Sequence, residues 1–439
     1  MSYAAYRPMN ELWLATIPKH WDCHKIKHIF SERIEKGYPD EPLLVASQNM
    51  GVVFKDIYGN RTVEATKDLH NLKLVCIGDF VISLRSFQGG LEYAYNQGII
   101  SPAYTVMMPG GQISGGYFRY FAKSRLFIEL LQMCVTGIRE GQNIDYGKLK
   151  NHLIPLPPRD EQDQIVRYLD WKVSQINKLI NAKRRQIVLL QEQRQAVIED
   201  ILSNISAQTL LCRYLGSLQN GISESGDFFT DGTPFVNYSD VYKNEILPPT
   251  VNGVAKANPK QQKTYSVEKG DIFFTRTSET IDEVGLTAVC DETIPQAVFS
   301  GFIIRFRPKN DTFHNQYAKY FFRSKKVRDY FTQEMNLVTR VSLGQTLLKN
   351  LPILLPDLET QRNIAIQLDE QCGRLDRLIY KLNDEITLCT EYRTRLISDV
   401  VTGKLDVRGV TVPEYEAVVD TSNEELLLDT DTEQEEIYQ

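Results

Sequence analysis

The sequence predicts an α+β fold in which two similar globular domains are joined by a pair of long antiparallel helices. Three observations predict it: the chain repeats itself at a nearly constant offset, each copy begins with short strand-like runs, and each copy ends in a long helical segment. At 439 residues the chain is long enough for two or three domains. We expect globular domains at 1–157 and 207–356, helices at 158–206 and 357–408, and a tail at 409–439.

The duplication is clearest where each globular part meets its helix. At an offset of 199 residues, LKNHLIPLPPRDEQ (149–162) aligns with LKNLPILLPDLETQ (348–361). Upstream the offset drifts, and GDFVISLR (78–85) aligns with GDIFFTR (270–276). Several matches in the same order indicate two copies whose loops have diverged.

The globular part of each copy contains apolar and aromatic runs separated by Gly, Pro, Asn and Asp, a pattern typical of strands. The clearest runs are KLVCIGDFVISL (73–84), GIISPAYTVMMP (98–109), KGDIFFTR (269–276) and FSGFIIRFRP (299–308). One further helix is expected inside each part, around Tyr117–Cys134 and Tyr317–Met335.

The segment that ends each copy lacks proline and keeps a seven-residue apolar repeat, which predicts a long helix. Some 40 residues at ~1.5 Å each span roughly 60 Å. The repeat has the same register in both copies, and a 3.5-residue period over about five heptads favours a coiled coil between the two helices. The alternative is that each amphipathic helix lies on its own domain. The expected spacer core positions are Leu169, Ile176, Ile180, Ile187, Leu190, Leu368, Leu375, Ile379, Leu382, Ile386 and Leu396.

Charged residues mark the start and the interior of both helices. Acidic residues at Asp160–Glu161 and Asp357–Glu359 provide acceptors and negative charge where the unpaired N–H groups of a helix start need them. Arg194 and Arg393 occupy the same core position in the two copies. We expect them either to set the register of the coiled coil or to extend their charged ends outward.

The net charge of −6 comes from the tail. Residues 409–439 contain ten acidic residues and no Lys or Arg, so the rest of the chain holds 50 basic and 46 acidic residues, a net charge of +4. Such an acidic tail is expected to be disordered, with DNA mimicry or partner binding as the alternative. A mildly basic body leaves nucleic-acid binding open.

Cysteine usage and hydropathy predict a cytoplasmic chain with no membrane segment. The seven cysteines are scattered and form no CxxC pair, which suits free thiols in a reducing compartment. No apolar run approaches the ~18 residues of a membrane helix, and the first residues do not have the pattern of a signal peptide.

Motifs for catalysis are missing from the sequence. It has no GxGxxG, GxxxxGK[ST], HExxH or GxSxG motif. His20, His24 and His28 are spaced by four and could bind a metal from one helix, but Pro18 and Trp21 in that stretch oppose a helix. We therefore expect a non-catalytic chain without a metal or cofactor of its own.

Arginines at matching places in both copies are the best candidates for contacts with DNA phosphates and base edges. Arg85 and Arg276 follow the strand that begins with Gly-Asp, and Arg139 and Arg340 lie in a polar loop before the long helix. The alternative for each is a solvated surface residue. The full candidate set is Arg85, Ser86, Gln88, Lys123, Arg125, Arg139, Gln142, Asn143, Arg276, Thr277, Ser278, Arg323, Lys325, Lys326, Arg340 and Gln345.

In this arrangement the chain resembles the specificity subunit of type I restriction–modification enzymes. The resemblance rests on LKNHLIPLPPRDEQDQIVRYLD and its second copy LKNLPILLPDLETQRNIAIQLD, on TGKLDVR (402–408) and on IPKHWDCHKI (17–26). It covers about residues 17–408. The second copy has Thr360 in place of the glutamate and an early Pro352, which puts the start of its helix in question.

The resemblance implies that each globular part is a target recognition domain reading one half of a bipartite double-stranded DNA target, with the helices as a spacer that sets the gap between half-sites. It implies two modification subunits that methylate adenine with S-adenosylmethionine, and motor–nuclease restriction subunits that use ATP and Mg. Two alternatives are a structural coiled-coil adaptor whose end domains bind proteins, and a self-contained restriction–methylation enzyme. The absence of a [DN]PP[YF] motif opposes the latter.

Overall fold

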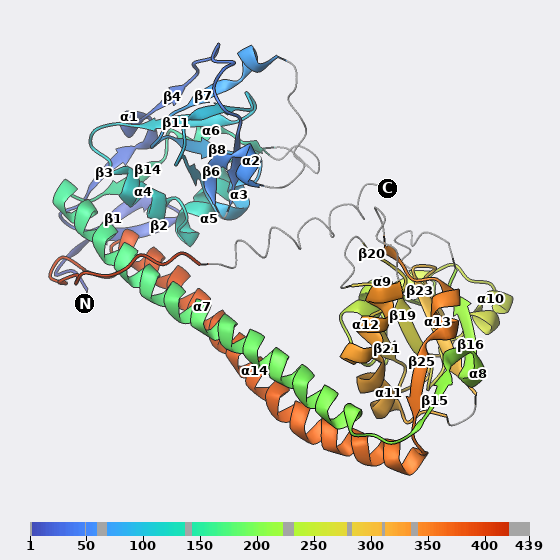
Figure 1. The fold of residues 1–439 in the computed structure, drawn as a ribbon. Helices are drawn as coiled ribbons and strands as arrows, with labels where there is room; N and C mark the ends of the chain where they lie inside the picture. The colour runs from blue at the N-terminus through green and yellow to red at the C-terminus, as the bar shows by residue number, and fades with distance from the viewer. Residues whose placement is uncertain are drawn as a thin grey trace. The chain divides into compact units, whose positions relative to one another are not determined.

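The computed structural model describes residues 2–48, 50–58, 68–136, 143–222, 232–278, 283–309, 312–334 and 341–420. The chain divides into two compact units, 1–185 with 382–439 and 186–381. Each unit contains one globular domain and the adjoining halves of both long helices (Figure 1), so the helices are shared between the units and do not form a separate domain. Both units mix strands and helices, which confirms the α+β class. None of the described helices is both long and apolar enough to cross a membrane.

The first domain consists of short strands and helices that lead into the first long helix. In chain order the elements are β1 (Tyr6–Glu11), β2 (Leu14–Pro18), β3 (Asp22–Lys25), α1 (Ile26–Ile29), β4 (Phe30–Arg33), β5 (Leu44–Ser47), β6 (Gly51–Phe54), α2 (Lys55–Tyr58), the 3-10 helix η1 (Leu69–Asn71), β7 (Lys73–Val75), β8 (Phe80–Ile82), α3 (Ser86–Gly89), β9 (Glu92–Tyr93), β10 (Gly98–Ile100), β11 (Thr105–Pro109), α4 (Gly115–Phe121), α5 (Arg125–Met133), β12 (Val135–Thr136), β13 (Asn143–Ile144), α6 (Tyr146–Leu149), β14 (Leu153–Leu156) and α7 (Arg159–Ser203). The largest sheet is antiparallel, with the order β4-β11-β8-β9.

The second domain follows the same plan and leads into the second long helix. Its elements are β15 (Gln208–Leu211), α8 (Cys212–Leu215), β16 (Gly216–Asn220), β17 (Thr233–Val236), α9 (Tyr238–Tyr242), β18 (Gly253–Ala255), α10 (Pro259–Thr264), β19 (Ile272–Thr275), β20 (Thr277–Ser278), β21 (Thr287–Val289), β22 (Val298–Phe299), β23 (Ile303–Pro308), α11 (Asn315–Phe322), α12 (Lys325–Glu334), β24 (Val341–Ser342), α13 (Gln345–Asn350), β25 (Pro352–Leu355) and α14 (Leu358–Val401). Its largest sheet is also antiparallel, with the order β16-β23-β19-β21.

The two central sheets are the structural counterpart of the sequence duplication. β4, β11, β8 and β9 occupy the same places in their sheet as β16, β23, β19 and β21 in theirs. The four predicted strand runs are confirmed, because they contain β7 with β8, β10 with β11, β19, and the end of β22 with β23. A two-stranded pair, β3 with β14 or β15 with β25, places the last strand of each domain immediately before its long helix.

The single helix expected inside each domain is wrong, because both domains have two helices there. α4 ends at Phe121 and α5 begins at Arg125. Ser124 is the N-cap of α5, and its hydroxyl accepts a hydrogen bond from the backbone N–H of Phe127. α11 and α12 are interrupted at the matching Ser324. The apolar pattern continues across the break because both short helices bury one face in the same core.

The core of each domain continues into the ends of the long helices. In the first unit, Leu169 of α7 and Val400 of α14 belong to the core of the first domain. In the second unit, Ile198 of α7 and Leu368 of α14 belong to the core of the second domain. Burial of these side chains attaches each helix end to its domain.

Between these ends, α7 and α14 pack on each other and run antiparallel. In the first unit Lys183 pairs with Glu385, and Arg393 Nη1 donates to Asn177 Oδ1 at 2.6 Å. From the first contact to the second, the residue number falls along α7 and rises along α14, so the two helices are antiparallel. All eleven expected spacer core positions are buried or half-buried. The alternative in which each helix lies only on its own domain therefore holds at the helix ends and is wrong for the stretch between them.

The prediction that residues 409–439 form a disordered tail is wrong for its first part. Residues 409–420 lie beside α7 (Figure 1), and polar side chains of α7 bind their backbone. This contact was invisible in the composition because backbone groups, which every sequence has, make most of it. Residues 421–439, with seven of the ten acidic residues, lie outside the described residues.

Candidate nucleic-acid interface and domain–helix joints

A glutamine at the start of each long helix ties that helix to its domain in the same way in both units. The side-chain amides of Gln162 and Gln361 are buried, and each donates two hydrogen bonds and accepts one, at 2.6–3.1 Å. The partners are the carbonyls of Gln112 and Pro157 and the N–H of Ser114 in the first unit, and the carbonyls of Thr312 and Pro356 and the N–H of His314 in the second. Because both ends of each amide are used, the glutamine fixes how the helix leaves its domain.

The Leu-Asp pair that ends each repeated motif supplies a second matched tie. Tyr120 O–H donates to Asp170 Oδ1 at 2.6 Å, and Tyr320 O–H donates to Asp369 Oδ1 at 2.8 Å. In each unit the basic residue before the tyrosine binds the same carboxylate. Burial, together with the nearby carboxylate, raises the pKa of both tyrosines, so both remain protonated donors.

Glu161 has a different role from the helix-start acceptor that we expected. Its buried carboxylate accepts from Tyr3 O–H at 2.6 Å and from Trp21 Nε1 at 3.0 Å, and it lies 2.7 Å from His20 Nε2. Glu161 therefore anchors the N-terminal segment at the start of α7, where the helix leaves the first domain. His20 belongs to this contact, while His24 lies in β3, so the three histidines do not share one helix.

The start of α14 in the second unit is capped, although Thr360 stands there in place of the glutamate. Asp357 Oδ1 accepts from the backbone N–H of Thr360 at 2.9 Å, and the Thr360 hydroxyl donates to the same carboxylate at 2.7 Å. The backbone hydrogen bond from Thr360 lowers the pKa of Asp357. One copy thus caps its helix with an aspartate, whereas the glutamate of the other copy serves the N-terminal segment.

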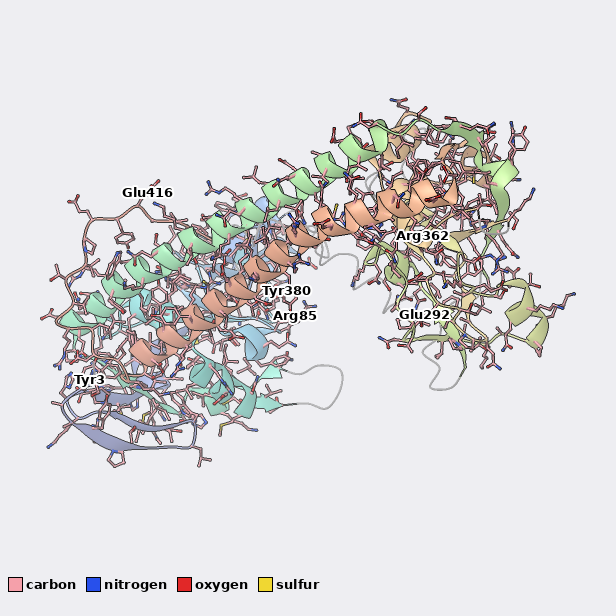
Figure 2. The ribbon with its side chains drawn as sticks, turned by 90° about the horizontal axis from the view of Figure 1, so that it is seen from below. Tyr3, Arg85, Glu292, Arg362, Tyr380 and Glu416 are labelled. Atoms are coloured by element: carbon pink, nitrogen blue, oxygen red, sulfur yellow. The ribbon has the colours of Figure 1, made fainter. Side chains whose placement is uncertain are left out.

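On the first domain, Arg85, labelled in Figure 2, directly precedes the short helix α3, and both Arg85 and Gln88 are exposed. The Arg85 carbonyl accepts from the Gln88 N–H at 2.9 Å and from Gln48 Nε2 at 3.1 Å. Ser86 is different, because it is fully buried and its Oγ accepts from the backbone N–H of Ser83 at 2.8 Å. Ser86 stabilises the turn, and we remove it from the candidate DNA-binding set.

On the second domain, the candidates lie where β19 ends and β20 begins. Arg276 is half-buried, and its Nη1 donates to the Gly301 carbonyl at 3.2 Å. Thr277 and Ser278 form β20, which pairs with β24. The backbone N–H of Leu343, directly after β24, donates to the Arg276 carbonyl at 2.7 Å. The structure thus brings together segments that are about 65 residues apart in the chain.

Two further side chains complete this cluster. Gln345 begins α13, and its Nε2 donates to Asn220 Oδ1 at 3.0 Å. Phe302 is 64% exposed, and its carbonyl accepts from the Arg276 N–H at 2.9 Å. Sequence reasoning missed Asn220 and Phe302. The sequence does contain a signal for Phe302: it is an aromatic residue directly after a glycine, in the turn between two strands.

Lys123 and Arg323 occupy matching positions, and both bind groups of their own domain. Lys123 Nζ lies 2.9 and 2.8 Å from the carboxylate oxygens of Glu92, which is fully buried. Burial raises the pKa of Glu92 to about 7, while the charge of Lys123 lowers it. Arg323 donates to the carbonyls of Thr287 and Asn244, both at 2.6 Å. A shared packing role accounts for their recurrence, so we remove both from the candidate DNA-binding set.

The remaining basic candidates of the internal helices lie at the surface. Arg125 pairs with Glu129 and Lys325 with Asp329, in both cases across one helical turn. Lys326 is exposed as well. Exposed pairs of this kind contribute little to stability and leave the cations accessible to a ligand.

Some predicted contacts lie in loops that the structure does not describe. Arg139, Gln142 and Arg340 fall outside the described residues. Asn143 begins β13 and is exposed. The candidates that the structure places at the surface are therefore Arg85, Gln88, Arg125, Asn143, Lys325 and Lys326, together with the half-buried group of Arg276, Thr277, Ser278 and Gln345.

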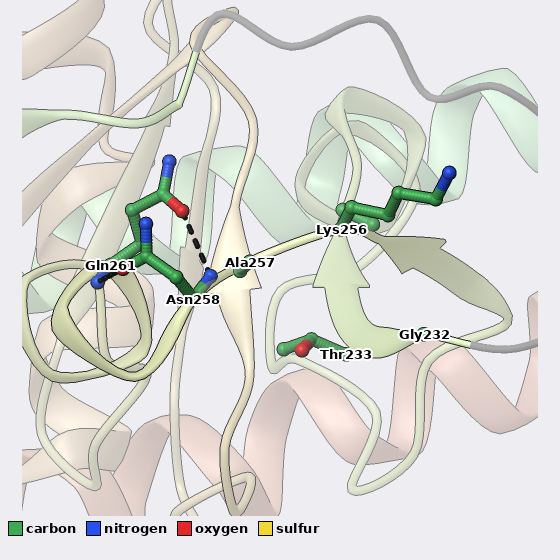
Figure 3. A pocket seen from close by; sticks show the side chains of 7 residues that line it. Gly232, Thr233, Lys256, Ala257, Asn258 and Gln261 are labelled. Atoms are coloured by element: carbon green, nitrogen blue, oxygen red, sulfur yellow. Dashed lines mark hydrogen bonds between the residues drawn. The ribbon is translucent and has the colours of Figure 1, made fainter.

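An open hollow of about 470 Å³ lies on the second domain (Figure 3). Asn258 and Gln261, on its wall, form a reciprocal cap of α10: each backbone N–H donates to the other's side-chain oxygen at 2.9 Å. These two polar side chains therefore serve the helix, and we assign no ligand to the hollow. Within the described ranges, no cluster of three or more His, Cys, Asp or Glu residues could hold a metal ion.

Comparison with known families finds a match in the second half of the chain. Residues 219–388 match the type I restriction modification DNA specificity domain. The second domain and part of α14 therefore carry the type I restriction modification DNA specificity domain. The resemblance inferred from its repeated motifs is thereby confirmed, and the matched range runs from β16 into α14.

The curated relatives of the chain are specificity subunits of type I restriction enzymes. The chain is 22% identical over 323 residues to the EcoKI specificity subunit of Escherichia coli strain K12, which covers 68% of each chain. It is 22% identical over 317 residues to the StySPI specificity subunit of Salmonella potsdam, which covers 68% of this chain and 67% of the relative. A solved structure of a type I restriction–modification system has a TM-score of 0.62 at 14% identity and covers 89% of this chain and 99% of its own, so the fold is shared.

Proposed function

We propose that this chain is the DNA specificity subunit of a type I restriction–modification complex, in which each domain reads one half of a bipartite target. The observation that carries the proposal is the matched joint, in which Gln162 and Gln361 make the same contacts in both units. A bipartite target needs two readers, and a duplicated domain with the same helix joint in each copy supplies two. The family match supports the same role.

We assign catalysis to partner subunits. Two modification subunits would methylate adenine with S-adenosylmethionine, and motor–nuclease subunits would use ATP and Mg. Both long helices carry leucines that face solvent: Leu179 and Leu388 are 48% and 62% exposed in the first unit, and Leu189 and Leu378 are 62% and 49% exposed in the second. The leucines match at an offset of 199, and two equivalent pairs of exposed leucines suit two copies of one partner.

We place the chain in the cytoplasm. All seven cysteines are free thiols, which suits a reducing compartment. The proposed ligand is DNA, either of the cell or entering it, and the chain would encounter this DNA in the cytoplasm.

Replacing Leu179 and Leu388 together with lysine is expected to weaken binding of the modification subunit at least tenfold, because a charge would enter an apolar contact. The measurement is titration of purified modification subunit onto the specificity chain, followed by size-exclusion chromatography and calorimetry. Leu12→Lys, at a leucine that is 94% exposed on the first domain, is the matched control. Equal affinity of the double variant and the control would remove this helix surface from the partner interface.

Sequencing the methylome of a host that expresses this chain with its modification subunit tests the proposed function directly. We expect one methylated motif made of two short defined sequences separated by unspecified bases. In vitro, binding to that site should weaken steeply with salt, because phosphate contacts release counterions. An adaptor would give no new methylated motif and no salt-dependent DNA binding even with the partner present.

Replacing Arg85 or Arg276 with alanine is expected to weaken binding to the cognate DNA by about 1–3 kcal/mol, or roughly 5- to 150-fold. Arg374→Ala is the control, because Arg374 is an exposed arginine of α14 that pairs with Glu370 across one turn. Fluorescence anisotropy with cognate and scrambled duplexes measures both effects. A melting curve shows whether loss of the Arg276–Gly301 contact changes folding. Unchanged affinity in a folded variant would remove that arginine from the site.

A further inference from the structure

The C-terminal strap, residues 409–420, lies on a polar face of α7 in the first unit (Figures 1 and 2). Ser174 Oγ donates to the Glu416 carbonyl at 2.9 Å and accepts from the Val418 N–H at 2.8 Å. Asn177 Nδ2 donates to the Val418 carbonyl at 3.0 Å, and the next turn of α7 continues the series of contacts. These side chains read backbone groups, so they recognise an extended peptide largely irrespective of its side chains.

Asn181 and Arg184 complete the polar face one turn further along α7. Asn181 Nδ2 donates to the Val419 carbonyl at 2.8 Å. Positions 174, 177, 181 and 184 are three or four residues apart, so they share one side of the helix. Arg184 Nη1 donates to Asp420 Oδ1, and Arg393 Nη1 of α14 donates to Asp420 Oδ2 at 2.7 Å. The two guanidinium groups hold one carboxylate that is only 9% exposed.

The second unit shows what this carboxylate replaces. Arg194 has the position in the repeat that Arg393 has in the other copy. Glu245 of the second domain lies 2.8 Å from Arg194 Nη2, and Asp376 of α14 lies 2.9 Å from Arg194 Nε. In the first unit the position that matches Asp376 is an asparagine, Asn177, and the carboxylate comes from the strap. A half-buried arginine between the helices thus obtains its counter-charge from a different segment in each copy.

The strap buries little apolar surface after its first residues. Val410 and Val412 pack against the core of the first domain. Of residues 413–419, only Val418 is half-buried, and the other six are exposed. Segments with few apolar contacts open at low free-energy cost. Attachment of the strap beyond Val412 therefore depends on the backbone contacts to α7 and on the Asp420 carboxylate.

We propose that the face formed by Ser174, Asn177, Asn181, Arg184 and Arg393 is a binding site for an extended peptide that carries an acidic side chain, and that the chain's own residues 416–420 occupy it as a releasable latch. The covalent connection gives the latch a high effective concentration, so it keeps the site closed against free peptides. Release exposes two guanidinium groups and three backbone-reading side chains for the acidic segment of another protein. This inference does not depend on the proposed DNA-binding function.

The test uses the full-length chain and a fluorescent synthetic peptide of residues 409–420. We expect no detectable binding of the peptide to the wild-type chain, whose latch fills the site. The Asp420→Ala chain, whose latch has lost its carboxylate, should bind the peptide with an affinity at least tenfold above the detection limit. Glu414→Ala removes the same charge from an exposed strap residue and should behave as wild type. A peptide with alanine in place of its final aspartate should not bind any of the three chains.

Hydrogen exchange supplies a second measurement that needs no peptide. The Val418 amide, which donates to Ser174, should be protected in the wild-type chain and should exchange at least tenfold faster after Asp420→Ala. Exchange that is equally fast in both chains would overturn the latch. Peptide binding that is the same for the wild-type and Asp420→Ala chains, or absent from both, would overturn the binding site.

Discussion

Insertion of one heptad into each long helix is expected to lengthen the unspecified spacer between the two methylated half-sites. Seven residues add about 10 Å to a helix at ~1.5 Å per residue, and base pairs are stacked ~3.4 Å apart in B-DNA. The spacer should therefore grow by up to about three base pairs. A full heptad also preserves the apolar register, so the helices can still pair.

The insertions belong after Arg185 in α7 and after Lys381 in α14, where the chain passes from one unit to the other. Contacts such as Lys183 with Glu385 then remain on the same side of the insertion. Methylome sequencing gives the spacer length directly. The control is a variant of unchanged length. In it, the heptad next to each insertion point is replaced by a heptad with different surface residues. An unchanged spacer in a folded, active insertion variant would contradict the ruler.

At pH 8, replacing Lys123 with methionine is expected to destabilise the first unit by up to about 3–5 kcal/mol, because it leaves a buried carboxylate without its partner. The carboxylate is that of Glu92, which is fully buried and accepts from the Lys123 ammonium group through both of its oxygens. Urea unfolding followed by tryptophan fluorescence reports this unit alone, since Trp13, Trp21 and Trp171 all lie in it.

The loss should depend on pH in a defined direction. Burial raises the pKa of Glu92 from 4.5 to about 7 in the folded protein, so folding favours its protonated form. Its contribution to stability is present below about pH 4.5 and is lost as the pH rises through about 7. Without Lys123 the pKa rises further, so the variant should be closer to wild type at pH 5 than at pH 8.

Arg125→Met is the control for Lys123→Met, because Arg125 makes an exposed ion pair across one turn and should change stability by less than about 0.5 kcal/mol. Two results would contradict the packing role of Lys123. One is a stability loss no larger than that of the control. The other is a loss of DNA affinity at unchanged stability, which would return Lys123 to the interface.

Much of the fold could be predicted because the duplication repeats local signals. The helices expected at 158–206 and 357–408 are observed at Arg159–Ser203 and Leu358–Val401. The heptad pattern predicted side chains that are buried or half-buried in the structure, since periodicity is a property of one segment and survives without tertiary information. The strands around the Gly-Asp motif were found for the same reason.

The candidate site was less predictable, because recurrence identifies a shared role without saying whether that role is inside or outside the domain. Lys123 and Arg323 recur because both fill a packing position, whereas Gln162 and Gln361 recur because both tie a helix to its domain. The partner of Lys123 lies 31 residues away in the chain, and no spacing rule connects the two. Charge and recurrence alone could not separate these residues from Arg85.

The sequence by itself determined that this protein has two copies of one domain, each followed by a long helix with the same apolar register. Only the tertiary structure decided which basic side chains remain available to a ligand, which glutamate serves the N-terminal segment, and that the acidic tail begins as an ordered strap. The reason is physical: periodic burial is written in neighbouring residues, whereas the counter-charge of an individual Lys or Arg comes from whichever distant segment the fold places beside it. Asp420 between Arg184 and Arg393 shows this directly.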